Sequence, residues 1–166
     1  MTKEDVIKIF NLKKVETIVL NQFISELKKI NSSRNLVGKS TLLNPWDRHI
    51  CDSLQIMSFI KNKNSSILDM GTGAGLPGIV LSILGYKNIT MIDSRKKKTE
   101  FVKLIIEKLE LKAKIINSRL EDVQLSSFQY ITSRALAPLD KLLNYSLFLL
   151  SFFEFDVFFL SSVFGL

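Results

Sequence analysis

The chain has 166 residues, of which 46% are hydrophobic and 23% charged, as in a single globular domain, and its formal net charge is +7. One cysteine and one histidine, Cys51 and His49, exclude an internal disulfide and a Cys/His zinc site, so we expect no metal. The basic surplus favours polyanionic partners, although many basic proteins bind none. Reduced cysteine and the lack of an apolar run behind the N-terminus predict a cytoplasmic protein.

The first 64 residues are expected to be helical. Apolar residues recur at steps of three or four from Val15 to Ile30, and again from Trp46 to Met57, which predicts two helices with one apolar face each. The polar stretch 31–35 is expected to connect them. We therefore predict an N-terminal helical extension over residues 1–64.

From residue 65 the pattern changes to short apolar runs that alternate with helical periodicity. This alternation predicts a parallel sheet covered on both faces, in a domain over residues 65–166. Pro138 suits the first turn of a helix that reaches Leu150. Strands are expected at 67–70, 89–93, 113–117 and 130–133, and helices at 79–84 and around 101–109.

Residues 142–166 contain no Lys or Arg and are rich in Phe. A membrane span is one interpretation, but Asn144, Glu154 and Asp156 interrupt the roughly 20 apolar residues that a span needs. A buried helix followed by a strand at 155–160 fits better, so we expect no membrane association.

The clearest motif is the glycine loop from Asp69 to Gly78, between the first strand and the next helix. Gly71, Gly73 and Gly75 permit a tight turn and close approach of a ligand to bare backbone. The following helix offers N–H groups to an anion, which in an S-adenosylmethionine (SAM) site would be the methionine carboxylate.

Two alternatives remain for this loop. One is a plain tight turn without a ligand. The other is a nicotinamide site, because Gly73, Gly75 and Gly78 also satisfy the dinucleotide spacing. Asp69 favours SAM, since its carboxylate can meet the ligand's ammonium group but would repel a pyrophosphate.

Further polar residues follow the later strands. Asp93 ends the second strand, where a carboxylate can accept both ribose hydroxyls or, alternatively, cap the next helix. Glu121 and Asp122 follow the third strand and could border an adenine. The run Arg95, Lys96, Lys97 and Lys98 places cations at a helix N-terminus, which predicts either an RNA-phosphate contact or a solvated face.

With these motifs in place, the chain resembles the bacterial 16S rRNA guanine-N7 methyltransferases, also called the glucose-inhibited division protein B family. The specific strings are Arg-His-Ile-x-Asp-Ser-Leu at 48–54 and Gly-Thr-Gly-x-Gly-Leu-Pro-Gly at 71–78. Weaker matches are Asn35-Leu36, the segment 92–94 with Lys97, the segment 118–122, and the segment 133–135.

The resemblance implies an α/β, Rossmann-like SAM-dependent methyltransferase fold. It also implies methyl transfer from SAM to N7 of a guanine in 16S rRNA, with the rRNA or the small ribosomal subunit as partner and a monomeric enzyme. N7 has a free lone pair, so no general base or covalent cysteine is required, and we assign no catalytic residue. The residues that match the family's SAM contacts are Gly71, Leu76, Leu120, Glu121 and Arg134. His49 and Asp52 lie in a helix that the family places beside the fold, and we assign neither a role; the simplest interpretation of His49 is a packed, hydrogen-bonded residue.

The C-terminal end departs from the family pattern, because residues 151–166 lack the expected Leu-Lys-Gly-like string. This predicts that the last strands are missing and that the chain is truncated near Leu150. The alternative function is therefore an inactive remnant that binds SAM or RNA without turnover.

Overall fold

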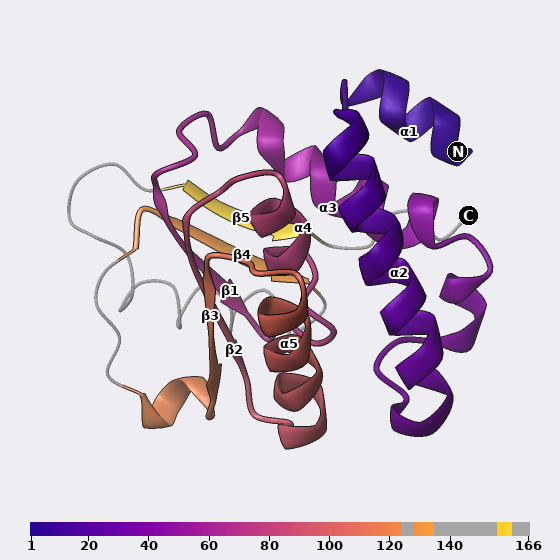
Figure 1. Ribbon diagram of the computed structural model, residues 1–166. Helices are drawn as coiled ribbons and strands as arrows, with labels where there is room; N and C mark the ends of the chain where they lie inside the picture. The colour runs from indigo at the N-terminus through magenta and orange to yellow at the C-terminus, as the bar shows by residue number, and fades with distance from the viewer. Residues whose placement is uncertain (124–127, 135–155, 161–166) are drawn as a thin grey trace.

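The computed structural model describes residues 1–123, 128–134 and 156–160 (Figure 1). The helix predicted from Pro138 to Leu150, and most of the Phe-rich tail, lie outside the described residues. No helix in the described ranges is long and apolar enough to cross a membrane.

The N-terminal part is helical, as predicted. After α1 (Lys3–Ile9), the long helix α2 spans Lys14–Arg34. Short helical turns follow: η1 (Lys39–Leu42), the π-helical η2 (Trp46–Cys51), α3 (Asp52–Leu54) and η3 (Gln55–Ser58).

Two details of the N-terminal prediction are wrong. Residues 31–34 are the last turn of α2 rather than a connection, because buried Asn31 accepts a hydrogen bond from the Val37 backbone N–H at 2.9 Å. The helix ends at Arg34, and the next residue, Asn35, adopts a left-handed conformation as its C-cap. Val15 and Ile18 are exposed, because the buried face of α2 is formed by Leu20, Phe23, Ile24 and Leu27.

Five parallel strands form one sheet, which confirms the predicted α/β class. Their order is β3-β2-β1-β4-β5, and all four strand pairs are parallel. The strands are β1 (Ser66–Met70), β2 (Asn88–Asp93), β3 (Ala113–Asn117), β4 (Tyr130–Arg134) and β5 (Asp156–Leu160). Every predicted strand is therefore present, including the one expected at 155–160.

Helices α4 (Gly78–Ile83) and α5 (Lys96–Lys108) lie on the same face of the sheet, and α2 packs against both of them (Figure 1). Phe23 of α2 and Phe101 of α5 have ring centroids 6.4 Å apart. Buried residues from α1 to α5 belong to one continuous hydrophobic cluster. The N-terminal helices therefore share their core with the sheet-containing part.

The strand order predicts a crevice at the carboxyl ends of β1 and β4, in the interior of the sheet. From β1 the chain proceeds outward through β2 to β3, and then returns to the other side of β1 to form β4 and β5. Loops leaving the carboxyl ends of β1 and β4 consequently diverge, and ligands of open α/β sheets bind at such a point.

Candidate functional site

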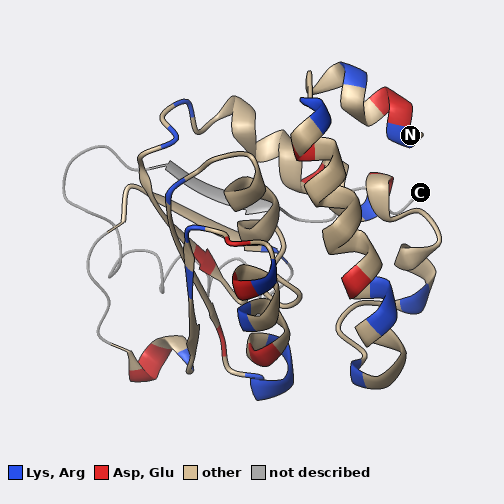
Figure 2. Cartoon of the chain, viewed as in Figure 1, with Lys and Arg blue, Asp and Glu red and all other residues tan. Residues whose placement is uncertain are grey.

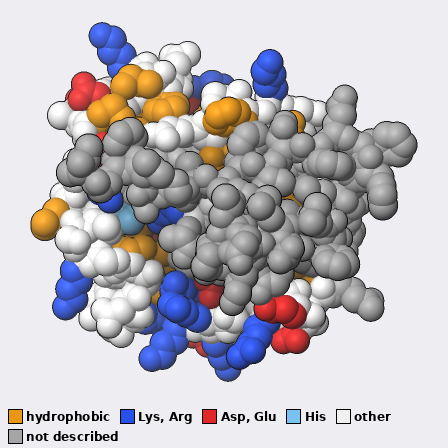
Figure 3. Space-filling view, turned by 180° about the vertical axis from the view of Figure 1, so that it is seen from behind, with side chains coloured by type: hydrophobic (Ala, Val, Ile, Leu, Met, Phe, Trp, Pro, Cys, Tyr) orange, Lys and Arg blue, Asp and Glu red, His pale blue; other side chains and the backbone are white. Residues whose placement is uncertain are grey.

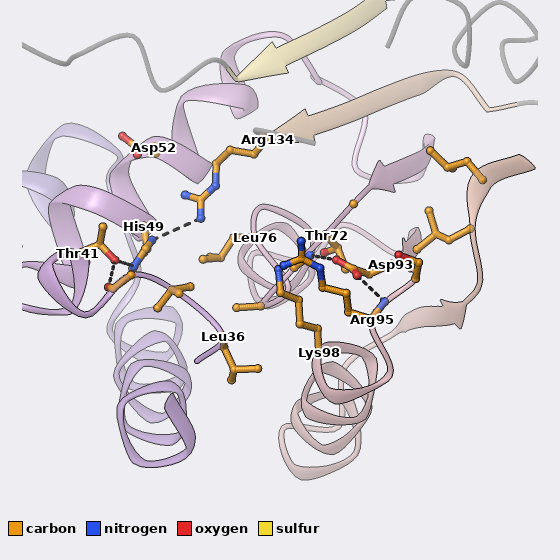
Figure 4. Close-up of a pocket in the computed structure, with 18 of the residues that line it drawn as sticks. Leu36, Thr41, His49, Asp52, Thr72, Leu76, Asp93, Arg95, Lys98 and Arg134 are labelled. Atoms are coloured by element: carbon orange, nitrogen blue, oxygen red, sulfur yellow. Dashed lines mark hydrogen bonds between the residues drawn. The ribbon is translucent and has the colours of Figure 1, made fainter. Parts of the chain in front are cut away.

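A cavity of about 740 Å³ lies at the carboxyl ends of the strands (Figure 4). Its volume falls within the range of about 300–1,000 Å³ typical of ligand pockets. Its walls come from the loop after α2, from η2, from the glycine loop after β1, from the end of β2 with the start of α5, from the turn after β3, and from the end of β4. The residues predicted after four different strands thus meet at one place.

The glycines of the loop have two different functions. All three have positive φ angles, 64° at Gly71, 60° at Gly73 and 86° at Gly75. Gly71 and Gly73 line the cavity, as predicted for a bare-backbone ligand contact. Gly75 does not line it, and a Cβ there would overlap the side chain of Ile79. Gly75 therefore permits α4 to pack closely against its own loop.

Asp69 supports the loop from inside. The side chain is fully buried, and its Oδ2 accepts hydrogen bonds from the Thr72 hydroxyl at 2.6 Å and the Gly78 backbone N–H at 3.0 Å. The Thr132 hydroxyl donates to Oδ1 at 3.1 Å. Burial raises the pKa of this carboxyl to about 6.

These contacts correct two expectations. Asp69 does not line the cavity, so it is not placed to meet a ligand's ammonium group. The N–H of Gly78, at the start of α4, is already bonded to Asp69, so it is not available to an anion. The physical reason is that the Asp69 carboxylate is turned into the protein, toward Thr72, Gly78 and Thr132, instead of toward solvent.

Asp93 fixes the opposite side of the loop. Its Oδ2 accepts from the Gly73 backbone N–H at 3.0 Å, and its Oδ1 accepts from the Arg95 N–H at 2.8 Å. The second contact is a turn contact to Arg95, the N-cap residue of α5, so Asp93 does not cap the first turn of that helix as the alternative supposed. The carboxylate also lines the cavity, and each oxygen has a second lone pair, so these contacts do not preclude a ligand contact.

The basic run divides between the cavity and the outer surface. Arg95 and Lys98 line the cavity, whereas Lys96 and Lys97 are exposed and lie outside its lining. Burial lowers the pKa of the half-buried Lys98 ammonium, and nearby Asp93 opposes that shift.

The turn after β3 and the end of β4 complete this side. Leu120 and Glu121, in η4 (Leu120–Asp122), line the cavity and so are placed where the predicted SAM contacts require, whereas exposed Asp122 does not line it. Arg134 enters from the end of β4, with its guanidinium directed into the cavity (Figure 4). Leu76 separates the Arg134 side from the Asp93 side.

Sequence reasoning missed the wall that the N-terminal part contributes. Leu36, Gly38 and Thr41 line the cavity, together with Arg48, His49 and Asp52. The family-specific string at 48–54 and the Asn35-Leu36 match were the available signals, but neither gave a role. His49 is 3% exposed and bonded on both ring nitrogens, so it is a packed residue as expected, yet it is also part of the cavity wall.

The lining carries a positive surplus. Arg48, Arg95, Lys98, Arg119 and Arg134 outnumber Asp52, Asp93 and Glu121. Lys and Arg also occur near the end of α2 and the start of α5, on the same side of the molecule (Figure 2). Seen from behind, blue side chains gather along the lower edge, below the one histidine (Figure 3). Within the described ranges, no three His, Cys, Asp or Glu side chains are grouped to hold a metal ion.

Comparison with known proteins identifies related sequences. The model of the family described as rRNA small subunit methyltransferase G matches residues 16–154. A ribosomal RNA small subunit methyltransferase G from Orientia tsutsugamushi is 41% identical over 125 residues, which is 75% of this chain and 63% of that protein. The protein of the same name from Zymomonas mobilis is 38% identical, over 74% of this chain and 59% of its own length. The chain thus spans about three fifths of the relatives that it matches.

Solved structures show the same fold at low identity. A putative S-adenosyl-L-methionine-dependent methyltransferase from Methanococcus maripaludis has a TM-score of 0.59 and 14% identity, over 90% of this chain and 65% of the other. A ribosomal protein L11 methylase from Lactobacillus delbrueckii subsp. bulgaricus has a TM-score of 0.57 and 21% identity, over 66% and 57%. These matches confirm a Rossmann-like methyltransferase fold.

Proposed function

The chain belongs to the rRNA small subunit methyltransferase G family, and we propose that it binds SAM in the cavity and methylates rRNA of the small ribosomal subunit. The acceptor implied by the sequence resemblance is N7 of a guanine in 16S rRNA. The observation that carries the proposal is the convergence of Gly71, Asp93, Glu121 and Arg134, from four different strand ends, on one cavity. Family membership argues against the nicotinamide alternative.

The cavity fits SAM on the evidence of its own donors and acceptors. Gly71 and Gly73 expose backbone without a Cβ, and Asp93 has lone pairs left for ribose hydroxyls. Leu120 and Glu121 would border the adenine, and Leu76 supplies apolar surface at the centre. Arg134 is a cation with N–H groups facing the cavity, suited to the methionine carboxylate or to an RNA phosphate.

The reaction needs little acid–base chemistry from the protein. When bound, SAM supplies an electrophilic methyl group, and guanine N7 has a lone pair to receive it. The chain's residues would bind and orient the two partners and exclude water. Cys51 does not line the cavity, and burial raises the pKa of its thiol, so this cysteine is not a nucleophile here.

The positive surplus of the cavity and its surroundings suits rRNA phosphates. Arg95 and Lys98 at the rim, with exposed Lys96 and Lys97 beside them, would contact the backbone near the target base. We propose that the chain acts as a monomer in the cytoplasm, where ribosomes are found.

The test is transfer of a tritiated methyl group from SAM to small ribosomal subunits that lack the modification. We expect label in the small-subunit rRNA and, after nuclease digestion, in 7-methylguanosine. Fully modified subunits are the control and should take up no label. Label at another atom would refute the N7 assignment, and no label from a folded, SAM-binding chain would refute the activity.

A further inference from the structure

His49 is the one histidine of the chain, and it joins two walls of the cavity (Figure 4). Its Nε2 lies 2.9 Å from the Thr41 hydroxyl in η1. Its Nδ1 lies 3.5 Å from Nη2 of Arg134, at the end of β4. The buried Ser53 hydroxyl also donates to the His49 carbonyl at 2.7 Å, which anchors the histidine backbone.

The partners fix which ring nitrogen carries the proton. The Thr41 hydroxyl has a single hydrogen and donates it to the Gly38 carbonyl at 2.7 Å, so it must accept from His49. The Arg134 guanidinium has only donors, so Nδ1 of His49 must accept from it. The Thr41 contact requires a proton on Nε2, and the Arg134 contact requires an unprotonated Nδ1. Together they define a neutral ring with its proton on Nε2.

We propose that His49 is a positioning residue for Arg134: its unprotonated Nδ1 accepts from Nη2 and holds the guanidinium facing the cavity. The second anchor is the Arg48 carbonyl, which accepts from Nη1 at 3.4 Å. Both acceptors are neutral. Among the described residues, no carboxylate forms an ion pair with Arg134 within 4.0 Å.

A neutral acceptor leaves the charge of Arg134 uncompensated, whereas a carboxylate would offset it. An arginine paired bidentately with Asp or Glu also has two of its guanidinium N–H groups occupied. Two single contacts instead restrict the long side chain while leaving its charge and remaining N–H groups available. Arg134 is therefore held ready for an anionic group, the SAM carboxylate or an RNA phosphate.

The charges around His49 keep it in this state. The positive charges of Arg134 and Arg48 disfavour a charged ring, and the charge of Asp52 partly balances that of Arg134. Burial first, and then the two arginines, lower the pKa of His49 to about 4. At neutral pH the ring is uncharged and Nδ1 stays available as an acceptor.

The first test needs no ligand and so does not rest on the proposed function. Because the chain has one histidine, a sample labelled with ¹⁵N-histidine gives one pair of ring-nitrogen signals. We expect the Nε2-protonated tautomer at pH 7. In Arg134→Leu the Thr41 contact should keep the proton on Nε2, while the Nδ1 signal should move because its donor is gone. A ring that is protonated at Nδ1, or charged, would overturn the proposal.

The second test measures SAM affinity and rests on the proposed function. His49→Leu removes the acceptor, and we expect Kd to rise about tenfold, the loss of one hydrogen bond to a charged group. His49→Asn keeps an acceptor near the Nδ1 position and should restore affinity to within about threefold. In an Arg134→Leu background, His49→Leu should have no further effect.

These tests distinguish a failure of the positioning role of His49 from a failure of the proposed function. Equal SAM affinity of folded wild type and His49→Leu would refute the positioning role while leaving the SAM site intact. Wild type that shows the expected tautomer but does not bind SAM would refute the proposed function only. Circular dichroism and urea unfolding establish that each variant is folded; if His49→Leu unfolds, the Asn variant and the tautomer measurement still decide the question.

Discussion

Two glycines of the loop after β1, Gly73 and Gly75, should have different effects when each is replaced by alanine. Both have positive φ angles, which cost a non-glycine residue about 1–2 kcal/mol. A Cβ at Gly75 would also overlap Ile79, and overpacking adds about 1–3 kcal/mol. At Gly73 the nearest atom to an added Cβ is Lys98 Nζ, 3.6 Å away, so no such term arises. We therefore expect Gly75→Ala to lose about 2–5 kcal/mol of unfolding free energy and Gly73→Ala about 1–2 kcal/mol.

The assay is urea unfolding of both variants, with SAM titration by calorimetry under conditions in which they remain folded. Gly73→Ala should weaken SAM binding more than its small stability loss explains, because its methyl group enters the cavity side of the loop. Gly75→Ala should lose stability first. A Gly75→Ala variant as stable as wild type, or a Gly73→Ala variant less stable than Gly75→Ala, would contradict this assignment.

Two further predictions concern titration and charge. The unfolding free energy of wild type, relative to that of His49→Gln, should fall by about 3 kcal/mol between pH 7 and pH 4, because the unfolded histidine protonates near pH 6.5 and the folded one near pH 4. Urea unfolding of both proteins at the two pH values measures this difference, and a difference that stays constant with pH would contradict the prediction. Replacing Lys96 and Lys97 with Gln should weaken rRNA binding and leave SAM affinity unchanged. The slope of log binding constant against log salt concentration should become smaller by about 0.9 per lost phosphate contact. Filter binding at several salt concentrations measures this slope, and an unchanged slope would mean that the two lysines form a solvated face.

The sheet and the glycine loop could be predicted because their signals are local. Short apolar runs followed by glycine or a carboxylate mark parallel strands and their carboxyl ends, so Asp93 and Glu121 were found. A fully buried strand has no polar face, however, so the sequence could not tell that Asp69 points toward Thr132 instead of the ligand side.

The wall formed by residues 36–41 could not be predicted for a different reason. It has no periodicity, and its position depends on tertiary contacts such as the Asn31 side chain with the Val37 backbone. The role of His49 could not be predicted either, because it depends on tertiary contacts. Its ring lies between Thr41 and Arg134, which are eight and 85 residues away along the chain.

The most direct test of the account is a crystal structure of the chain with S-adenosylhomocysteine, the demethylated form of SAM. We expect the ligand in the cavity, with its ribose at Asp93, its adenine beside Leu120 and Glu121, and its carboxylate within hydrogen-bond distance of Arg134. A ligand bound away from the Gly71–Leu76 loop, or a folded chain whose cavity remains closed to it at saturating concentration, would contradict the account.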